Sequence, residues 1–198
     1  MSNNTKRVVF LDRDGVINST QKGYVNKPED FEFIFGSTYA IKSLNDAGIM
    51  TVIVTNQGGI EKGYYTEEDF LRVQDYMEEQ LKKFRAKIDH TYYCKYLDSY
   101  YRKPFPGMIT GAIKDLKLDN YKKYMVGDRI TDIIAGNRAN CTTILVKTGD
   151  GSKELQKITS SDGLKYSNKI NSLEATPNYI TANLKSAVKW ILNGEKEY

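Results

Sequence analysis

Short apolar runs without polar alternation recur along this chain, and segments with helical periodicity separate them. The runs have the length of strands and are rich in Val and Ile, as is typical of strands buried on both faces. They lie at 7–11, 50–54, 90–94, 124–126, 143–146 and, more weakly, 179–180. Interleaved helices provide the crossovers that parallel strands need. The sequence therefore predicts the α/β class: a three-layer α/β/α sandwich around a mainly parallel, Rossmann-like sheet.

Helical periodicity and end signals predict five helices between these strands. Ser37 is expected to cap one of them, Thr66 to begin a second and Pro106 to begin a third, and two more are expected at 131–137 and 181–192. The segment 157–175 is polar and irregular and is expected to be a surface loop. Because the 198 residues contain no linker rich in Pro or Gly, we expect a single domain over 1–198.

Charge and cysteine content exclude several classes of protein. Lys and Arg number 29 against 25 Asp and Glu, a mild excess without the dense basic run of a nucleic-acid or membrane tail. The apolar run at 8–11 is too short for a signal-peptide core or a membrane span. The spacing of Cys94 and Cys141 is typical of neither a metal site nor a disulfide, so both are expected in the core. We expect a cytoplasmic protein with no nucleic-acid or membrane partner.

Acidic and polar residues follow three of the predicted strands. Ligands bind at the carboxyl ends of parallel strands, so residues at these points are informative. The first strand runs into Asp12 and Asp14, a second ends in Thr55-Asn56, and a third ends in Gly127-Asp128. Converging carboxylates repel one another unless a cation lies among them, and oxygen ligands without His or Cys favour Mg²⁺ over zinc. The sequence predicts a magnesium site suited to phosphoryl chemistry.

A positively charged partner for these carboxylates is available in Arg102-Lys103-Pro104. Lys103 precedes Pro104 and is therefore expected to be extended, near the start of the helix at Pro106. Its ammonium is suited to hold a carboxylate and a phosphate together, and the planar guanidinium of Arg102 is suited to bind a substrate oxygen.

These segments resemble the haloacid dehalogenase (HAD) superfamily of aspartate-nucleophile phosphatases. The resemblance is carried by DRDGV at 12–16, TN at 55–56, Lys103 and GDRITD at 127–132, in the order of the family and with no room for a large cap domain. Alone, the first motif is weak because calcium loops use similar residues, but four motifs at predicted strand ends or helix starts are specific.

The resemblance implies a role for each matching residue. Asp12 is the expected nucleophile, forming an aspartyl-phosphate, and Asp14 the expected general acid and then base. Mg²⁺ is expected on Asp12, the backbone carbonyl of Asp14, and Asp128. Thr55 is expected to hydrogen-bond the phosphate, and Lys103 to neutralise charge beside Asp12.

Further residues are expected in substrate binding or support. Asn56 and Arg102 are expected to contact substrate, with Thr55 and Lys103. Gly15 allows a sharp turn after the aspartates, so that 15–33 forms a flap over the site. Asp132 is expected to support Lys103 or a metal-bound water, although a charge at a helix N-terminus is an equally good interpretation. Arg129 is expected among the supporting residues.

A narrower resemblance extends over most of the chain. FLDRDGVIN, KPEDFEFIFGS, TNQGGIEKGYYTEEDF, RKPFPGM and VGDRITDIIAGNRA resemble the D-glycero-D-manno-heptose 1,7-bisphosphate phosphatases, whose near relatives are histidinol-phosphate phosphatases. That group usually has a zinc loop with several cysteines before Arg-Lys-Pro. Here only Cys94, with His90 upstream, occupies this stretch, so zinc is not expected. The role of the tyrosine-rich segment 92–101 stays open.

The resemblance predicts a Mg²⁺-dependent phosphatase acting on the 7-phosphate of a heptose bisphosphate, in precursor synthesis for lipopolysaccharide or capsule. Histidinol-phosphate phosphatase is the alternative. A nucleic-acid 3′-phosphatase is disfavoured by the weak basic excess. A non-catalytic phosphosugar-binding protein is disfavoured because binding alone needs neither Asp12 nor Asp14. A small-molecule sugar phosphate is the expected partner, and a monomer is the expected state.

Overall fold

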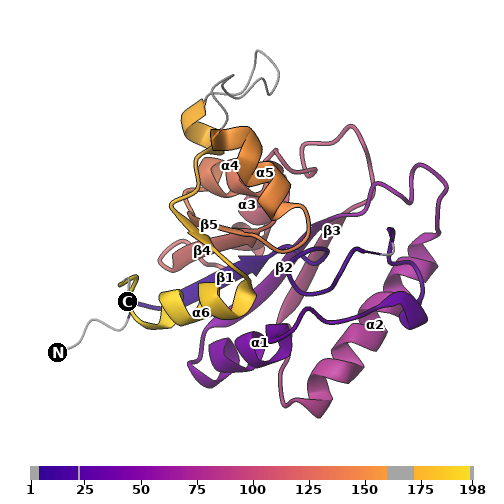
Figure 1. The fold of residues 1–198 in the computed structure, drawn as a ribbon, viewed down its shortest axis with the longest axis horizontal. Coiled ribbons are helices and arrows are strands. Elements are labelled where there is room, and N and C mark those ends of the chain that lie inside the picture. The colour runs from indigo at the N-terminus through magenta and orange to yellow at the C-terminus, as the bar shows by residue number, and fades with distance from the viewer. Residues whose placement is uncertain (1–4, 22, 160–171, 197–198) are drawn as a thin grey trace.

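Six parallel strands form one sheet in the order β3-β2-β1-β4-β5-β6 in the computed structural model, which describes residues 5–21, 23–159 and 172–196 (Figure 1). The strands are β1 Arg7–Leu11, β2 Met50–Asn56, β3 His90–Cys94, β4 Lys122–Gly127, β5 Thr142–Val146 and β6 Tyr179–Thr181. Each predicted strand lies within one of these. The order is that of a doubly wound sheet: β2 and β3 are added on one side of β1, and β4, β5 and β6 on the other.

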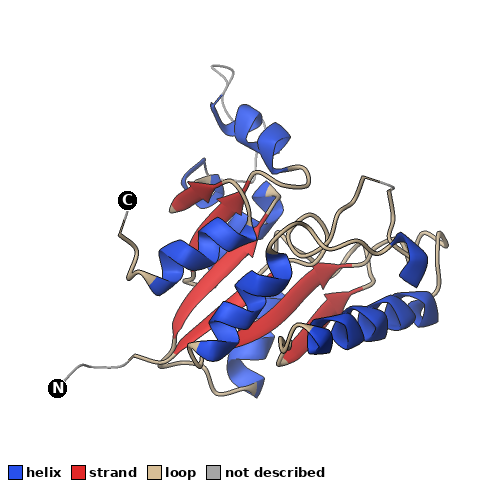
Figure 2. Cartoon of the chain, turned by 60° about the horizontal axis from the view of Figure 1, so that its bottom comes forward, coloured by secondary structure: helices blue, strands red, loops and turns tan. Residues whose placement is uncertain are grey.

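Helices cover both faces of the sheet, as Figure 2 shows. They are α1 Ser37–Asp46, α2 Glu67–Lys83, α3 Gly107–Asp115, α4 Ile130–Arg138, α5 Gly151–Thr159 and α6 Leu184–Leu192. Helices α1, α2 and α6 share one apolar cluster with Val9 and Leu11, whereas α3 and α4 share the other with Val8 and Phe10. Successive residues of β1 thus point to opposite faces, as in any strand. The predicted three-layer sandwich is confirmed.

Helix starts were predicted with mixed success. Thr66 caps α2 as predicted, because its hydroxyl accepts a hydrogen bond from the backbone of Asp69 and the Asp69 carboxylate accepts one from the backbone of Thr66. The expectation for Ser37 is wrong: the cap is Gly36, in the left-handed region at φ +85°, and Ser37 is the first helical residue. The Ser37 hydroxyl instead donates to the carbonyl of Ile17.

Two expectations near the C-terminus also need correction. The helix expected from 181 begins at Leu184, because Thr181 pairs with Val146 in the sheet and Asn183 supplies the cap. The loop expected at 157–175 starts inside α5, a helix that the polar sequence GSKELQKIT did not reveal, and ends in a 3₁₀ turn at Ser172–Ala175. Its middle, 160–171, lies outside the described residues.

The sheet brings the motif segments to one edge. Leu11, the last residue of β1, pairs with Ile53 of β2 and with Val126 of β4. The residues that follow these three positions therefore emerge side by side, at the carboxyl edge where the strand order reverses. Within the described part of the chain, no helix has the length and apolar character needed to cross a bilayer.

Candidate active site

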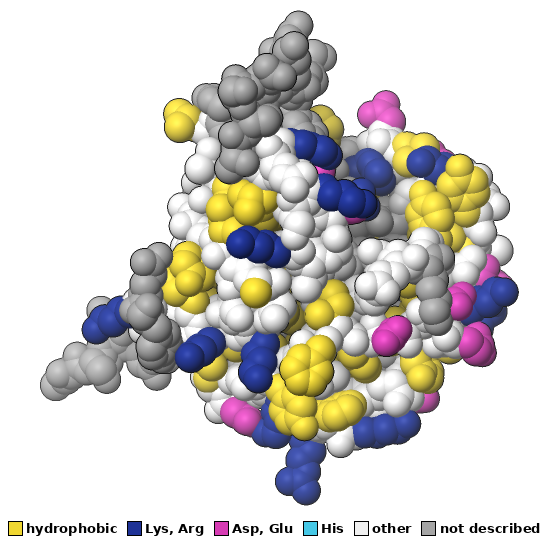
Figure 3. Space-filling view, in the orientation of Figure 1, with side chains coloured by type: hydrophobic (Ala, Val, Ile, Leu, Met, Phe, Trp, Pro, Cys, Tyr) yellow, Lys and Arg dark blue, Asp and Glu magenta, His cyan; other side chains and the backbone are white. Residues whose placement is uncertain are grey.

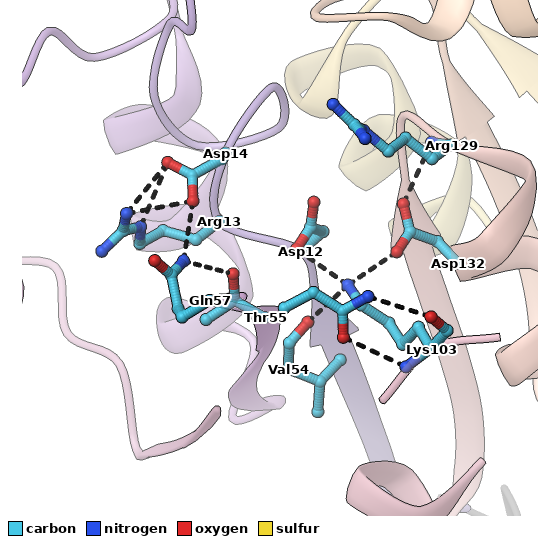
Figure 4. Close-up of polar contacts among 10 residues, drawn as sticks. Asp12, Arg13, Asp14, Val54, Thr55, Gln57, Lys103, Arg129 and Asp132 are labelled. Atoms are coloured by element: carbon cyan, nitrogen blue, oxygen red, sulfur yellow. Dashed lines mark hydrogen bonds and ion pairs between the residues drawn. The ribbon is translucent and has the colours of Figure 1, made fainter. Parts of the chain in front are cut away.

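Lys103 forms the centre of a buried polar cluster at this edge (Figure 4). Its ammonium lies 2.8 Å from Oδ1 of Asp12 and 2.6 Å from Oδ1 of Asp132, and it donates to the carbonyl of Val54 over 2.7 Å. Burial would lower the pKa of Lys103, but the two carboxylates outweigh it and raise the pKa above its usual value. Lys103 therefore stays charged beside Asp12.

Asn56 holds the backbone of Lys103 in this position. Its amide oxygen accepts from the backbone N–H of Lys103 and its amide nitrogen donates to the Lys103 carbonyl, both over 3.0 Å. Because both ends of the amide are engaged in this way, Asn56 orients Lys103. The expected contact of Asn56 with substrate stays a prediction.

Three carboxylates meet around a position suited to a cation. Oxygen atoms of Asp12, Asp128 and Asp132 lie within 4.8 Å of one another. Asp132 is already engaged, since Oδ1 faces Lys103 and Oδ2 accepts from the backbone of Arg129. Oδ1 of Asp128, in contrast, is buried without a hydrogen-bond partner among the described residues.

The electrostatics of this group fit a divalent cation. Burial, together with the nearby Asp12 and Asp132, raises the pKa of Asp128 to about 8. Burial also raises the pKa of Asp12 to about 6, although Lys103 opposes the shift. One ammonium is insufficient for three buried carboxylates, and a hard cation would relieve the deficit. Asp12 and Asp128 would hold Mg²⁺, an ion that prefers such oxygen ligands.

Asp14 lies in a separate cluster, although it is only two residues from Asp12. Figure 4 shows its carboxylate turned toward Arg13 and Gln57 and away from Lys103. It accepts hydrogen bonds from the Arg13 guanidinium over 3.0 Å, the Gln57 amide over 2.9 Å and the Asn18 amide over 3.0 Å. Burial alone would raise the pKa of Asp14, but Arg13 and these amides outweigh it and lower the pKa.

Arg13, Asn18 and Gln57 contact Asp14, although no role was predicted for them from the sequence. Arg13 is almost completely buried, with its guanidinium 5.1 Å from the centre of the Phe70 ring. Gln57 also donates to the hydroxyl of Thr55 and accepts from that of Tyr65. The one available signal was their location inside the motif segments DRDGVIN and TNQGG, since nothing in their residue types indicates burial.

A cavity of about 810 Å³ opens above these clusters. Its walls include Thr55, Arg102 and Arg129, and the segment expected to be a flap contributes Thr20, Gly23, Tyr24 and Val25. Lys and Arg side chains gather beside the hollow in Figure 3. The cations that line the cavity are Arg13, Lys62, Arg102, Lys103, Arg129, Lys153 and Lys157. This wall suits an anionic ligand.

The cations of the wall differ in their partners. Arg129 and Lys153 both form ion pairs with Asp150. Nη1 of Arg102, in contrast, is buried without a hydrogen-bond partner among the described residues, beside Gly58. Arg102 therefore retains donors for an incoming oxygen ligand, whereas Arg129 is tied to the loop that follows β5.

The tyrosine-rich segment before Arg102 presents three rings to solvent. Tyr96, Tyr100 and Tyr101 are each more than half exposed.

Cys94, at the end of β3, is buried and its thiol donates to the carbonyl of Tyr96. Cys141 is buried as well, as expected of a small core residue.

Comparison with known proteins gives consistent results. Residues 100–187 match the HAD-hydrolase-like family model. D-glycero-beta-D-manno-heptose-1,7-bisphosphate 7-phosphatase of Pasteurella multocida is 39% identical over 171 residues, which are 79% of this chain and 92% of that protein. The enzyme of the same name from Yersinia pestis is 36% identical over 188 residues, 89% of this chain and 96% of that protein.

A solved structure with a similar fold carries ligands. D,D-heptose 1,7-bisphosphate phosphatase from B. bronchiseptica, complexed with magnesium and phosphate, superposes with a TM-score of 0.82 at 27% identity. The match covers 95% of this chain and 99% of that one. The similarity therefore extends over nearly all of both chains.

Proposed function

We propose that this chain, which belongs to the D-glycero-D-manno-heptose-1,7-bisphosphate 7-phosphatase family of HAD phosphatases, removes the 7-phosphate of a heptose 1,7-bisphosphate with the help of Mg²⁺. The observation that carries the proposal is the position of Asp12. Its buried carboxylate follows β1, contacts Lys103 and lies beside the carboxylate of Asp128. A carboxylate in this setting is suited to be a nucleophile toward phosphorus.

Asp12 and Asp14 divide the reaction between them. A carboxylate oxygen of Asp12 attacks phosphorus, the bond from phosphorus to the sugar oxygen breaks, and that oxygen takes a proton from Asp14. Asp14 then removes a proton from a water whose oxygen attacks phosphorus, and the bond to Asp12 breaks. Asp14 has to leave Arg13 and Gln57 and take up a proton from solvent before it can protonate the leaving oxygen, so its observed orientation, in which these partners lower its pKa, is a resting one.

The surrounding residues bind and orient the phosphate. Thr55 and Lys103 would donate hydrogen bonds to its oxygens. When bound to Asp12, Asp128 and the backbone carbonyl of Asp14, Mg²⁺ would neutralise negative charge on the phosphoryl group. Asp132 keeps Lys103 in place, and Arg129 donates its backbone N–H to Asp132. The segment 15–33 would act as a flap, since its residues 20 and 23–25 line the cavity.

The cationic wall supports a bisphosphate substrate over histidinol phosphate. Arg102 and Lys62 line the same cavity as the carboxylates and would bind a second anionic group. Histidinol phosphate carries a positive amino group, which these cations would repel. The anomer is left open in the proposal because similar relatives are named for both: the Burkholderia mallei protein for the alpha form and the Pasteurella protein for the beta form.

A substrate panel tests the proposal. Phosphate release is measured for both anomers of the bisphosphate, histidinol phosphate, hexose phosphates and a 3′-phosphorylated oligonucleotide, with and without Mg²⁺. We expect a heptose bisphosphate to be hydrolysed fastest and only with Mg²⁺. If histidinol phosphate or the oligonucleotide were hydrolysed fastest, the proposed substrate would be wrong.

One substitution separates catalysis from binding alone. Asp12→Asn removes the nucleophile and should abolish hydrolysis while the chain stays folded by circular dichroism. Asp119→Asn, at an exposed position, is the matched control and should leave the rate unchanged. Full activity of the Asp12 variant would overturn the mechanism, and no activity of the wild type on any phosphate would favour a non-catalytic binding protein.

Three further features complete the proposal. The enzyme would contain no zinc, because Cys94 and the exposed His90 cannot alone close a tetrahedral site. Two buried free thiols suit a reducing cytoplasm. It would act as a monomeric single domain, because the site is built from one chain. Metal analysis of the purified protein and its sedimentation behaviour test the first and the third.

A further inference from the structure

The loop between β5 and α5 contacts Asp128, although this loop belongs to none of the motif segments. The backbone N–H of Asp150 donates to Oδ2 of Asp128 over 2.8 Å. The other oxygen of Asp128, Oδ1, is the buried one that has no partner in the described part of the chain. The loop thus determines which oxygen of Asp128 is engaged and which stays available.

Two glycines leave room for this arrangement. Gly149 has φ +56°, and a Cβ added there would lie 2.1 Å from Oδ2 of Asp128 and 2.6 Å from Cα of Gly15. A Cβ added to Gly15, at φ +90°, would lie 2.1 Å from the same oxygen. Neither position can carry a side chain unless Asp128 moves, because these distances are far shorter than a van der Waals contact.

A further hydrogen bond joins the loop to the turn after Asp14. The hydroxyl of Thr148 donates to the carbonyl of Gly15 over 2.7 Å. The loop therefore touches both segments that are expected to supply metal ligands, the turn after β1 and the end of β4. The carboxylate of Asp150 takes no part in this contact, since it faces Arg129 and Lys153.

We propose that Thr148-Gly149-Asp150 is a positioning element for the divalent cation, which holds Oδ2 of Asp128 so that Oδ1 is presented to the ion. This inference rests on the proposed function, because it takes Asp128 as a Mg²⁺ ligand. Residues that orient a metal ligand without touching the metal commonly affect affinity about 10- to 100-fold. Metal affinity would then depend on a loop that the four motifs do not include.

Mg²⁺ binding measured by calorimetry without substrate tests the inference. Gly149→Ala should weaken binding about 10- to 100-fold, because the new methyl group displaces Asp128. Gly48→Ala is the matched control: Gly48 has φ +66° and open space around its Cβ position, so it shares the backbone strain but not the contact. Its affinity should equal that of the wild type. An unchanged affinity of Gly149→Ala would overturn the inference.

Two other variants keep the test decisive if Gly149→Ala does not fold. Thr148→Val preserves shape but loses the hydrogen bond to Gly15, and it should weaken Mg²⁺ binding. Thr110→Val, the matched control, loses a comparable hydroxyl hydrogen bond, to the carbonyl of Pro106 at the start of α3, and should bind like the wild type. Unchanged binding by Thr148→Val, in that case, overturns the inference. A wild-type chain that binds no Mg²⁺ overturns the proposed function and this inference with it, whereas normal wild-type binding with unaffected loop variants overturns the inference alone.

Discussion

The two buried carboxylate clusters of the site each contain one cation, yet they respond to burial in opposite ways. Lys103 is shared between Asp12 and Asp132, and the pKa of Asp12 is raised to about 6. Arg13 faces Asp14, and the pKa of that carboxyl is lowered. Burial acts on both aspartates in the same direction, so the difference lies in what surrounds them.

The ratio of cations and amide donors to carboxylates explains the difference. The Lys103 cluster has three carboxylates for one ammonium, counting Asp128. In the Arg13 cluster, a single carboxylate receives a guanidinium and the amides of Asn18 and Gln57. A cluster with too little positive charge suits a divalent ion. A cluster whose carboxylate already has a cation and hydrogen-bond donors keeps that carboxylate ionised. Five predictions test this comparison.

The largest effect is expected for Lys103→Met. Removing the cation leaves Asp12 and Asp132 buried and uncompensated, which should cost about 3–5 kcal/mol of unfolding free energy. Hydrolysis should fall more than about 100-fold, as when a charge-stabilising donor is lost. Urea unfolding and phosphate release measure the two effects, with Lys82→Met at an exposed position of α2 as control. Near-wild-type stability would show that Lys103 does not balance this cluster.

A smaller loss of stability is expected for Arg13→Met. The Asp14 side chain is 26% exposed and keeps its two amide partners, so the cost should be about 1–3 kcal/mol. Arg72→Met, which breaks an exposed ion pair on α2, should cost less than about 1 kcal/mol. Urea unfolding compares the three proteins. If Arg13→Met cost as much as Lys103→Met, the two clusters would not differ as described.

The raised pKa of Asp128, about 8, predicts a pH dependence of Mg²⁺ binding. Between its ordinary pKa of 3.8 and pH 8, the folded metal-free chain retains a proton that the unfolded chain loses, so its stability falls as pH rises. Mg²⁺ must displace this proton, so its affinity should rise about tenfold per pH unit between pH 6 and pH 8, and more steeply below pH 6, where Asp12 also binds a proton. Calorimetry at several pH values, in buffers of different ionisation enthalpy, should detect the proton released. A pH-independent affinity would contradict the raised pKa.

The contribution of Asp14 to stability should depend on pH in the opposite direction to that of Asp128. Because its pKa is lowered in the folded chain, the stability that it contributes is present above its ordinary pKa and is lost only as pH falls through the folded value. In the Asp14→Asn variant, the pH dependence of Mg²⁺ binding between pH 6 and pH 8 should stay that of the wild type, because Asp14 is not among the groups that raise the pKa of Asp128. A changed dependence would show that the two clusters titrate together.

The smallest effect is expected at the outer edge of the Asp14 cluster. Tyr65→Phe removes the hydrogen bond of 2.7 Å to Gln57 and should cost about 1 kcal/mol. The Gln57 amide still donates to Asp14, so most of the hydrolytic activity should remain. Tyr39→Phe, at an exposed position, is the control for loss of a hydroxyl. A loss of stability as large as that of Arg13→Met would show that Tyr65 contributes as much as Arg13 to this cluster.

The sheet was predictable because its strands are buried on both faces. Such strands read as continuous runs of Val and Ile, and their parallel arrangement follows from the helices between them. Helix α5 was missed because its sequence carries few apolar residues, and the start of α6 was misplaced because a strand of three residues precedes it. Local patterns lose their information where an element is short or mostly polar.

The sequence by itself determined which groups meet: parallel strands end at one edge, so Asp12, Thr55 and Asp128 had to lie together. The tertiary structure decided how they are used. Asp14 is turned to Arg13, Asn56 holds the backbone of Lys103, and Gly149 lies against Asp128. Strand direction follows from chain connectivity, whereas side-chain orientation depends on charges and hydrogen-bond partners contributed by segments distant in the chain, and no local pattern encodes these.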